Sequence, residues 1–313
     1  MSSSRPGCAR LSAEESELTV GAGVELPATL TLPEGSGPHA AIVPLHPASE
    51  RGRDQMLFAH LAEVLPRAGI AVLRYDRRGD DVPLDDQVAD ALSAVAALQR
   101  RSDIDRTRIG LWGFSQGAWV APRAASVTRD VAFLVLVAAT GVSPAAQMRY
   151  GTARHVREAG YSADVVARLM VLRTAFEDYA RGQIERSTAQ GVVDSVKDEP
   201  WFEHAYVRAD LPSAPGFWPD MDFDPVSYFR DVRVPTLLFY GEDDEWQPID
   251  ESITAWRRAA DLAGNPEVTI VRLPGTRHAP TTGDVDERRA ISPEYEDELL
   301  GWLSEGGFAR MGD

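Results

Sequence analysis

The sequence predicts an α/β fold: a mostly parallel, doubly wound sheet, preceded by an N-terminal antiparallel hairpin and interrupted by a helical lid insertion. Short apolar runs, of the kind buried on both faces, alternate with amphipathic helical segments from residue 40 to residue 140, which is typical of strand–helix–strand units. The alternation stops at about residue 143 and resumes after residue 226. We therefore expect residues 1–142 and 227–313 to form the core and residues 143–226 to form the lid insertion.

The first part of the chain predicts the hairpin and the first strands and helices of the core. Residues 18–20 and 24–32 alternate between apolar and polar side chains on either side of Gly21-Ala22-Gly23, which predicts a hairpin. The apolar runs that predict the following strands are residues 40–45, 70–75, 109–112 and 131–138. The segments with apolar residues on one helical face are residues 55–67, 85–101 and 119–125.

The second part predicts the insertion and the end of the core. Between residues 143 and 226 there is no strand-like run, whereas residues 163–180 form a strong helical pattern and residues 184–196 a weaker one. The sheet pattern then resumes. Its predicted strands are residues 234–240 and 268–273, and its predicted helices are residues 249–263 and 293–303.

The composition restricts the classes of partner. The 313 residues carry a formal charge of -16 at pH 7, which argues against nucleic acid and anionic membrane surfaces because no basic patch would meet them. No stretch approaches the ~18 consecutive apolar residues of a spanning helix, and residues 1–10 lack the apolar core of a signal peptide. The single cysteine, Cys8, excludes an internal disulfide framework. We expect a soluble cytoplasmic protein.

A serine stands between two glycines where a predicted strand meets a predicted helix. The pattern is Gly113-Phe114-Ser115-Gln116-Gly117, with residues 109–112 before it and residues 119–125 after it. A chance match in a glycine-containing loop is the plain alternative, but the strand and helix on either side favour a sharp turn that exposes a nucleophile. The Gln116 amide would then point at a carbonyl under attack.

A nucleophilic serine needs a base and a carboxylate, and both residue types follow later strands. Asp243 and Asp244 come after residues 234–240, and His278 comes after residues 268–273. Because the carboxyl ends of parallel strands meet at one edge of a sheet, these side chains are expected to converge on Ser115. The plain alternatives are a solvated acidic turn and a surface histidine. The chain order Ser, Asp, His differs from the orders of the chymotrypsin and subtilisin folds.

On these motifs the chain resembles the α/β-hydrolases. More narrowly, it is similar to bacterial esterases related to the prolyl-oligopeptidase and dienelactone-hydrolase branches, without the propeller domain of the peptidases. The matching motifs are Leu45-His46, Tyr75-Asp76-Arg77-Arg78-Gly79, Gly113-Phe114-Ser115-Gln116-Gly117, Tyr240-Gly241-Glu242-Asp243-Asp244 and Leu273-Pro274-Gly275-Thr276-Arg277-His278. The resemblance covers residues 17–305.

The resemblance implies roles for individual residues. The family pattern Gly-x-x-Asp implies Asp244 as the triad acid, with Asp243 as the competitor, and Pro-Gly-x-x-His implies His278 as the base. The amides of Gln116 and Ala48 would form the oxyanion hole. The family has glycine after the histidine that matches His46, whereas this chain has Pro47, which fixes its own φ and has no amide.

Several residues are candidates for binding the substrate. Besides His46, which in the family shapes its loop, the candidates are the aromatic residues of the insertion, and packing within the protein is the alternative for each of them. They are Trp201, Phe202, Phe217 and Trp218. Arg77 and Arg78 would attract a carboxylate-bearing substrate or, as we favour, form ion pairs with nearby aspartates.

The expected activity is that of a serine hydrolase that cleaves a carboxylic ester of a small or medium-sized substrate through an acyl-enzyme. A thioesterase, an amidase or a peptidase would use the same triad. A non-hydrolytic acyltransferase, a cyclase or a ligand-binding protein is the alternative from another class, and Pro47 keeps it open.

The histidines and Cys8 lack metal-ligand spacing and no phosphate-binding loop is present, so we expect no metal and no cofactor. The expected partner is a small-molecule acyl substrate, and a homo-oligomer is compatible with the sequence.

Overall fold

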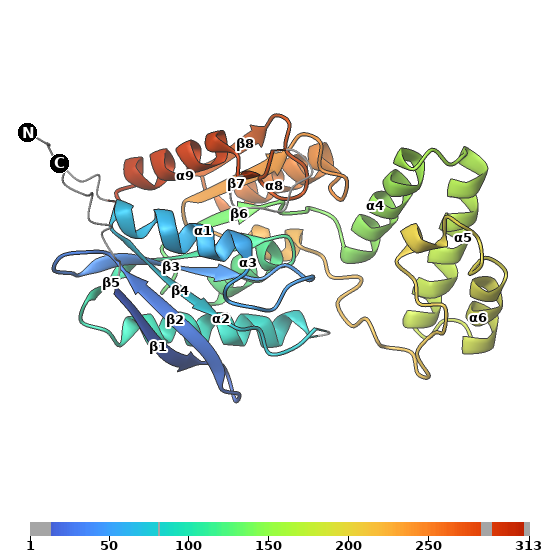
Figure 1. The fold of residues 1–313 in the computed structure, drawn as a ribbon, viewed down its shortest axis with the longest axis horizontal. Helices are drawn as coiled ribbons and strands as arrows, with labels where there is room; N and C mark the ends of the chain where they lie inside the picture. The colour runs from blue at the N-terminus through green and yellow to red at the C-terminus, as the bar shows by residue number, and fades with distance from the viewer. Residues whose placement is uncertain (1–13, 81, 283–289, 310–313) are drawn as a thin grey trace, which may run out of the picture.

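The computed structural model describes residues 14–80, 82–282 and 290–309 (Figure 1). The expectations for Cys8 and residues 1–10 therefore lie outside the described residues. The described chain forms one eight-stranded sheet in the order β1-β2-β4-β3-β5-β6-β7-β8. The strands are β1 (Glu14–Val20), β2 (Leu26–Leu32), β3 (His39–Leu45), β4 (Ile70–Tyr75), β5 (Ile104–Phe114), β6 (Phe133–Val137), β7 (Thr236–Gly241) and β8 (Val268–Leu273).

The pairing of the strands confirms the predicted fold class. β1 pairs antiparallel with β2, and β2 pairs antiparallel with β4. The remaining neighbours, from β4 through β3 to β8, are parallel. The sheet is thus mostly parallel with an antiparallel hairpin at its N-terminal edge.

Helices cover both faces of the sheet (Figure 1). Side chains of α2 (Leu84–Gln99), α3 (Gly117–Val127) and α8 (Ile249–Ala263) form a buried cluster with one face. Side chains of α1 (Met56–Val64) and α9 (Pro293–Glu305) form a second cluster with the other face. Within β3, Val43 belongs to the first cluster and Ile42 to the second, as the alternation of side chains along a strand requires. Burial on both faces explains the continuous apolar runs of the inner strands.

Several element boundaries differ from the sequence-based expectation, and three of the differences have a clear physical reason. β1 begins at Glu14, not at residue 18, because its outer residues are exposed and polar on an edge strand. β5 begins at Ile104, not at residue 109, because its first half is largely solvent-exposed. The helix expected over residues 55–67 ends at Val64 and a short 3-10 helix, η1 (Pro66–Ala68), follows, since Pro66 has no amide with which to continue the α-helix.

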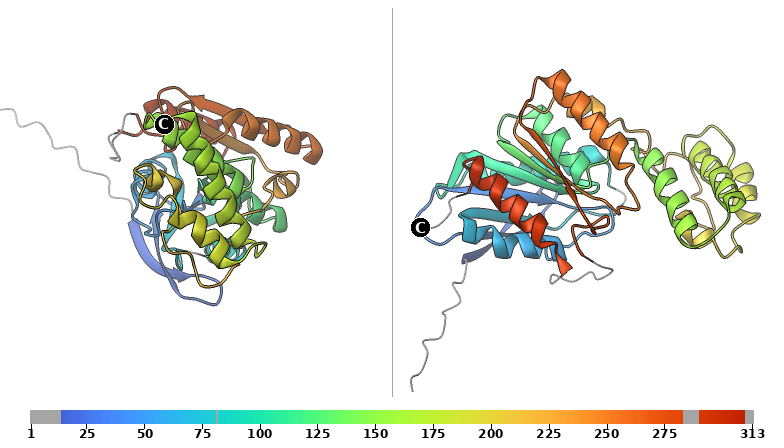
Figure 2. Two further views of the ribbon diagram at one scale, coloured as in Figure 1. Left: turned by 90° about the vertical axis from the view of Figure 1, so that its right-hand side faces the viewer. Right: turned by 90° about the horizontal axis from the view of Figure 1, so that it is seen from above.

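The chain between β6 and β7 is helical and stands beyond the carboxyl ends of the parallel strands (Figure 2). We call residues 143–226 the insertion. Its elements are α4 (Pro144–Glu158), α5 (Ala163–Ala180), α6 (Arg186–Asp194), η2 (Phe202–Ala205) and the start of α7 (Val226–Phe229). Val156, Leu169 and Trp201 belong to a buried cluster that the insertion forms by itself.

The sequence-based prediction gives no range for α4. Ser143 caps this helix by accepting a hydrogen bond from the Ala146 amide at 3.3 Å, and Pro144 is its first residue. This pair is a recognised start signal, but the buried residues of the helix, among them Gly151 and Ala153, are too small to form an apolar stripe. No described helix has the length and apolar character needed to cross a membrane.

Candidate functional site

Ser115 lies in a strained turn between β5 and α3. Its φ is 52°, in the left-handed region that costs a non-glycine residue about 1–3 kcal/mol. A Cβ at Gly113 would collide with the carbonyl oxygen of Gly117, and a Cβ at Gly117 would collide with that of Leu45. Only glycine therefore permits the backbone approach that this turn needs.

His278 connects Ser115 to a buried aspartate. Its Nε2 lies 2.9 Å from Ser115 Oγ, and its Nδ1 lies 2.9 Å from Asp244 Oδ2 and 3.1 Å from Asp244 Oδ1. Asp244 is 0% exposed, whereas Asp243 is exposed. Of the two candidate aspartates, the structure brings Asp244 against the imidazole.

The loops that carry Asp244 and His278 hold each other in position. The Asp243 amide donates to the Thr276 carbonyl at 3.0 Å. A Cβ at Gly241 would collide with the carbonyl oxygen of Arg277, so glycine at the end of β7 lets the two loops approach. The Trp246 amide also donates to Asp244 Oδ1 at 2.8 Å, which orients the carboxylate.

The surroundings of His278 raise the pKa of its imidazole. Burial alone would lower the pKa of His278, but the charge of Asp244 and its hydrogen bond outweigh burial, and the pKa is raised above its ordinary value. At a pH above this pKa the ring is neutral, so Nε2 can accept the Ser115 proton. The protonated ring that results is stabilised by Asp244.

Among the backbone amides without an acceptor within the described residues are those of Gln116 and Ala48. Gln116 is the N-cap of α3, where the helix dipole favours negative charge. Ala48 lies in the loop after β3 and follows Pro47. Free amides of this kind stabilise a developing oxyanion.

Arg77 ties these two amide-bearing segments together. Its side chain is 3% exposed, and its Nη1 donates to the Pro47 carbonyl and to Gln116 Oε1, both at 2.9 Å. Its Nη2 donates to the Ala48 carbonyl at 2.9 Å. Arg77 therefore fixes the Pro47-Ala48 loop relative to Gln116, although Pro47 replaces the family glycine.

The neighbouring Arg78 behaves as the sequence-based interpretation favoured. Its Nε donates to Asp90 Oδ2 at 2.7 Å in an ion pair. Arg77 also forms the expected ion pair, with Asp80 at 4.0 Å, but in addition it donates to the carbonyl oxygens of Pro47, Ala48 and the Gln116 side chain. The sequence carries no signal for this difference, because backbone carbonyls are present at every residue.

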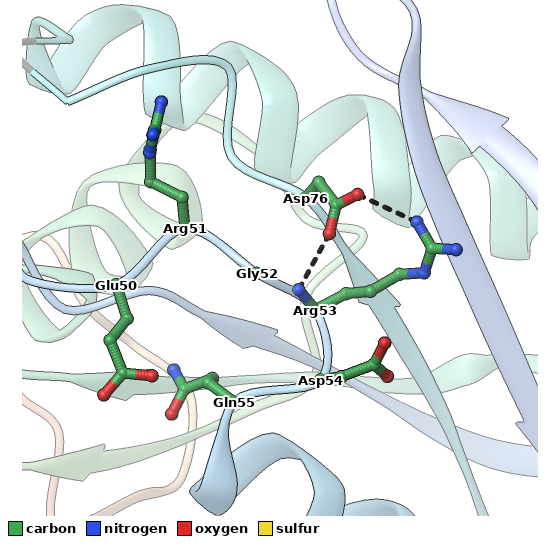
Figure 3. A pocket seen from close by; sticks show the side chains of 7 residues that line it. All are labelled: Glu50, Arg51, Gly52, Arg53, Asp54, Gln55 and Asp76. Atoms are coloured by element: carbon green, nitrogen blue, oxygen red, sulfur yellow. Dashed lines mark hydrogen bonds and ion pairs between the residues drawn. The ribbon is translucent and has the colours of Figure 1, made fainter.

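The loop after Ala48 is also held by the residues that follow β4. Figure 3 shows Arg53 against Asp76, with its amide and its Nη1 each donating at 2.8 Å. The Arg77 amide donates to the Arg51 carbonyl at 2.9 Å. The polar hollow in Figure 3 is lined by this loop and by Asp76, and not by Ser115 or His278. We therefore interpret its polar residues as contacts that hold the loop in place, and not as a binding site.

His46 is buried against aromatic rings. It is 2% exposed, with ring centroids 4.8 Å from Phe58 and 5.3 Å from Tyr75. Burial, assisted by the charge of Arg77, lowers the pKa of His46 to about 3. A neutral, enclosed imidazole of this kind shapes the loop after β3 and does not face a substrate.

The four aromatic candidates of the insertion separate into two groups. Trp201 is 1% exposed inside the core of the insertion, and Phe202 packs against the same cluster. Phe217 also packs against this cluster, but it and Trp218 line a cavity of about 290 Å³. Only this second pair is positioned to meet a ligand.

The sequence analysis missed the contacts between α4 and the loops that carry Asp244 and His278. Arg154 Nη1 donates to the Asp244 carbonyl at 2.7 Å, and its Nη2 donates to the Asp243 carbonyl at 3.2 Å. Glu158 forms an ion pair of 3.3 Å with Arg277, next to His278. Spaced four apart on one helix, Arg154 and Glu158 resemble a surface ion pair in the sequence, so their long-range partners left no signal.

Metal ligands do not gather at this site. Within residues 14–80, 82–282 and 290–309, no group of three or more His, Cys, Asp or Glu side chains is arranged to hold a metal ion. The chemistry that these residues offer is proton transfer and nucleophilic attack by Ser115.

Known proteins resemble this chain along most of its length. A family model described as the alpha/beta hydrolase family matches residues 45–289. The esterase EstD of Thermotoga maritima is 26% identical, over 93% of this chain and 67% of EstD. The structure of the Pyrococcus furiosus esterase Pf2001 has a TM-score of 0.60 at 17% identity, over 94% of this chain and 91% of that chain. The Pyrococcus horikoshii acylaminoacyl peptidase has a TM-score of 0.55 at 15% identity, over 94% of this chain and 42% of the peptidase.

Proposed function

Because the chain belongs to the alpha/beta hydrolase family, we propose that it is a serine hydrolase that cleaves a carboxylic ester of a small or medium-sized substrate. Ester hydrolysis as the general activity accords with the similarity to an esterase over 93% of the chain. The finer proposal is carried by one observation, the hydrogen-bonded row from Ser115 through His278 to Asp244.

In the first half of the proposed reaction the acyl group moves to Ser115. His278 Nε2 takes the hydroxyl proton as Ser115 Oγ attacks the ester carbonyl. The carbonyl oxygen becomes an oxyanion, which the amides of Gln116 and Ala48 stabilise. His278 then gives its proton to the leaving alkoxide, and the C–O bond of the ester breaks.

In the second half water releases the acyl group. His278 removes a proton from water as the oxygen attacks the acyl-enzyme, and it returns a proton to Ser115 Oγ as the acid leaves. Throughout, Asp244 keeps the Nδ1 proton of His278 in place and stabilises the charged ring. The insertion serves as a lid over this site, held against the catalytic loops by Arg154 and Glu158.

Turnover of p-nitrophenyl esters from acetate to octanoate tests the function. With the purified protein we expect saturable release of p-nitrophenol, and slower cleavage of the matching anilides and thioesters. A higher kcat/KM for the anilide or the thioester would move the assignment to an amidase or a thioesterase. Absence of turnover for all three series would contradict a hydrolase and favour the acyltransferase, cyclase or ligand-binding alternatives.

The pH dependence follows from the raised pKa of His278. The base must be neutral, so kcat/KM is expected to rise with pH through an apparent pKa above 6.5, the ordinary value for histidine. The measurement is a profile of kcat/KM from about two pH units below neutrality to about two above it, which spans the range in which histidine titrates. A profile that falls over this range, or a pKa below the ordinary value, would contradict His278 as a base paired with Asp244.

Arg77 is expected to act as a positioning residue. Arg77→Gln removes the donors that join the Pro47-Ala48 loop to Gln116, so we expect kcat to fall about a hundredfold, as loss of one oxyanion donor does, with KM little changed. Arg78→Gln is the matched control, because it breaks a neighbouring ion pair and lowers the melting temperature without lowering kcat. Equal losses of kcat in both variants would contradict a positioning role and would show that Arg77 affects activity only through the stability of the fold.

A further inference from the structure

The cavity inside the insertion has aromatic walls. It measures about 290 Å³, and its aromatic side chains come from α5 and from the chain between η2 and α7. They are Phe176, Tyr206, Phe217 and Trp218. Aromatic rings of this kind bind the apolar body of a ligand.

Two guanidinium groups also line this cavity, and no acidic side chain does among the described residues. Arg208 is exposed and has no hydrogen-bond or ion-pair partner within the described part of the chain. Arg173 pairs at 3.2 Å with buried Glu177, which also binds Arg149 at 2.7 Å. One carboxylate thus serves several guanidinium groups, and the cavity is positive in a protein whose net charge is -16.

Arg173 has an unused donor. The residue is 1% exposed, and its buried Nε has no hydrogen-bond partner among the described residues. Its guanidinium carbon lies 5.3 Å from the centroid of Phe176 and 5.8 Å from that of Trp218, so it is flanked by two rings of the cavity wall. A buried donor without an acceptor is costly, so the positive charge of Arg173 is only partly compensated beside the cavity.

One wall of the cavity contacts the loop of the triad acid. The Tyr206 ring packs edge-on against Trp246 at 4.9 Å. The Trp246 amide is the group that donates to Asp244 Oδ1. Tyr206 has a φ of 52°, so its backbone is held in an unfavourable conformation at the point where cavity and core meet.

A second contact with the core lies close in sequence to Trp218 of the cavity wall. Trp218 is followed by Asp220, whose Oδ2 accepts a hydrogen bond of 2.8 Å from the Leu84 amide at the start of α2. One turn later, Gln87 donates to Gln116 Oε1 at 3.2 Å. Residues in or next to the cavity wall therefore contact the core at two places, the loop that carries Asp244 and the start of α2.

We propose that this cavity binds the part of the substrate remote from the scissile bond, and that this part is an apolar body ending in a carboxylate. The rings bind the apolar body, exposed Arg208 binds the carboxylate through charge-assisted hydrogen bonds, and the charge of buried Arg173 attracts it. The role as a substrate subsite rests on the proposed hydrolase function, but binding at the cavity needs no turnover.

Binding to the Ser115→Ala protein tests the subsite separately from the chemistry. We expect 4-phenylbutyrate to bind about tenfold or more tightly than neutral 4-phenylbutyramide, since only the acid forms charged hydrogen bonds. Isothermal titration calorimetry measures both affinities, and quenching of tryptophan fluorescence reports contact with Trp218. Arg208→Gln is expected to lower the affinity for the acid about tenfold and to leave the amide unchanged.

Arg157→Gln is the matched control, because Arg157 is an exposed arginine of α4 that does not line the cavity. It removes the same charge from the same insertion and is expected to change neither affinity. Equal binding of acid and amide, or equal effects of the two arginine variants, would overturn the proposed subsite. If the acid is selected as expected but no ester is turned over, the hydrolase proposal fails while the carboxylate site stands.

Discussion

Replacement of Ser115 by alanine is expected to lower kcat for ester hydrolysis by about a million-fold, the scale seen when a triad nucleophile is removed. The physical reason is that no other hydroxyl lies within hydrogen-bond distance of His278 Nε2 among the described residues. The measurement is the initial rate of p-nitrophenyl ester cleavage by wild type and variant, with circular dichroism as the control for folding.

A small residual rate in Ser115→Ala is compatible with the mechanism, because the oxyanion donors and substrate binding still act without the nucleophile. A variant with the full wild-type rate would instead show that Ser115 is not the nucleophile. Alanine fits the space of the Ser115 side chain, and glycine remains at positions 113 and 117. The turn is therefore expected to keep its shape in the variant.

Replacement of Asp244 by asparagine is expected to lower kcat by about 10⁴-fold, as the wrong imidazole tautomer does in other triads. The asparagine side chain would keep the shape of the buried carboxylate but lose the charge that raises the pKa of His278. The apparent pKa of kcat/KM is therefore expected to fall below that of the wild type. Both quantities come from one series of pH profiles.

Asp243→Asn is the matched control for this prediction. Asp243 is the adjacent residue, is exposed and contributes its backbone, not its carboxylate, to the Arg154 contact. Its variant is expected to retain kcat within about twofold, as surface substitutions usually do. A large loss in Asp243→Asn with near-normal activity in Asp244→Asn would reverse the assignment of the acid.

The parts of the site that depend on local backbone geometry were predictable from the sequence. Ser115 and its flanking glycines form a motif within five consecutive residues, and the neighbouring strand and helix are required by the same turn. His278 could be proposed because it lies in the loop that follows β8, a strand of the parallel sheet. The fold class followed from the alternation of apolar runs and amphipathic helices.

The local sequence pattern did not distinguish Asp243 from Asp244, because two adjacent aspartates in a turn have the same chemistry and differ only in where their side chains point. In the structure Asp244, and not Asp243, contacts His278, and Gly241 lets the two loops approach each other. The resemblance to a family indicated Asp244, but the residues alone left both aspartates open. Burial of the carboxylate and its contact with His278 are properties of tertiary structure.

The contacts of Arg77 and Arg154 were also beyond sequence analysis. Both donate to backbone carbonyls of distant segments, Arg77 to Pro47 and Ala48 and Arg154 to Asp244. A carbonyl acceptor leaves no trace in side-chain identity. Their roles become visible only when the loops after β3 and β7 are placed in space.

Covalent labelling with a fluorophosphonate tests the central proposal, an activated Ser115, most directly. A serine activated by a neighbouring base attacks the phosphorus, fluoride leaves, and a stable adduct remains on Oγ. Intact-mass and peptide mass spectrometry are predicted to find one adduct, on Ser115, in the wild type and none in Ser115→Ala or in acid-unfolded wild type. Labelling that persists in Ser115→Ala, or ester turnover by a wild-type protein that takes up no label, would contradict Ser115 as the catalytic nucleophile.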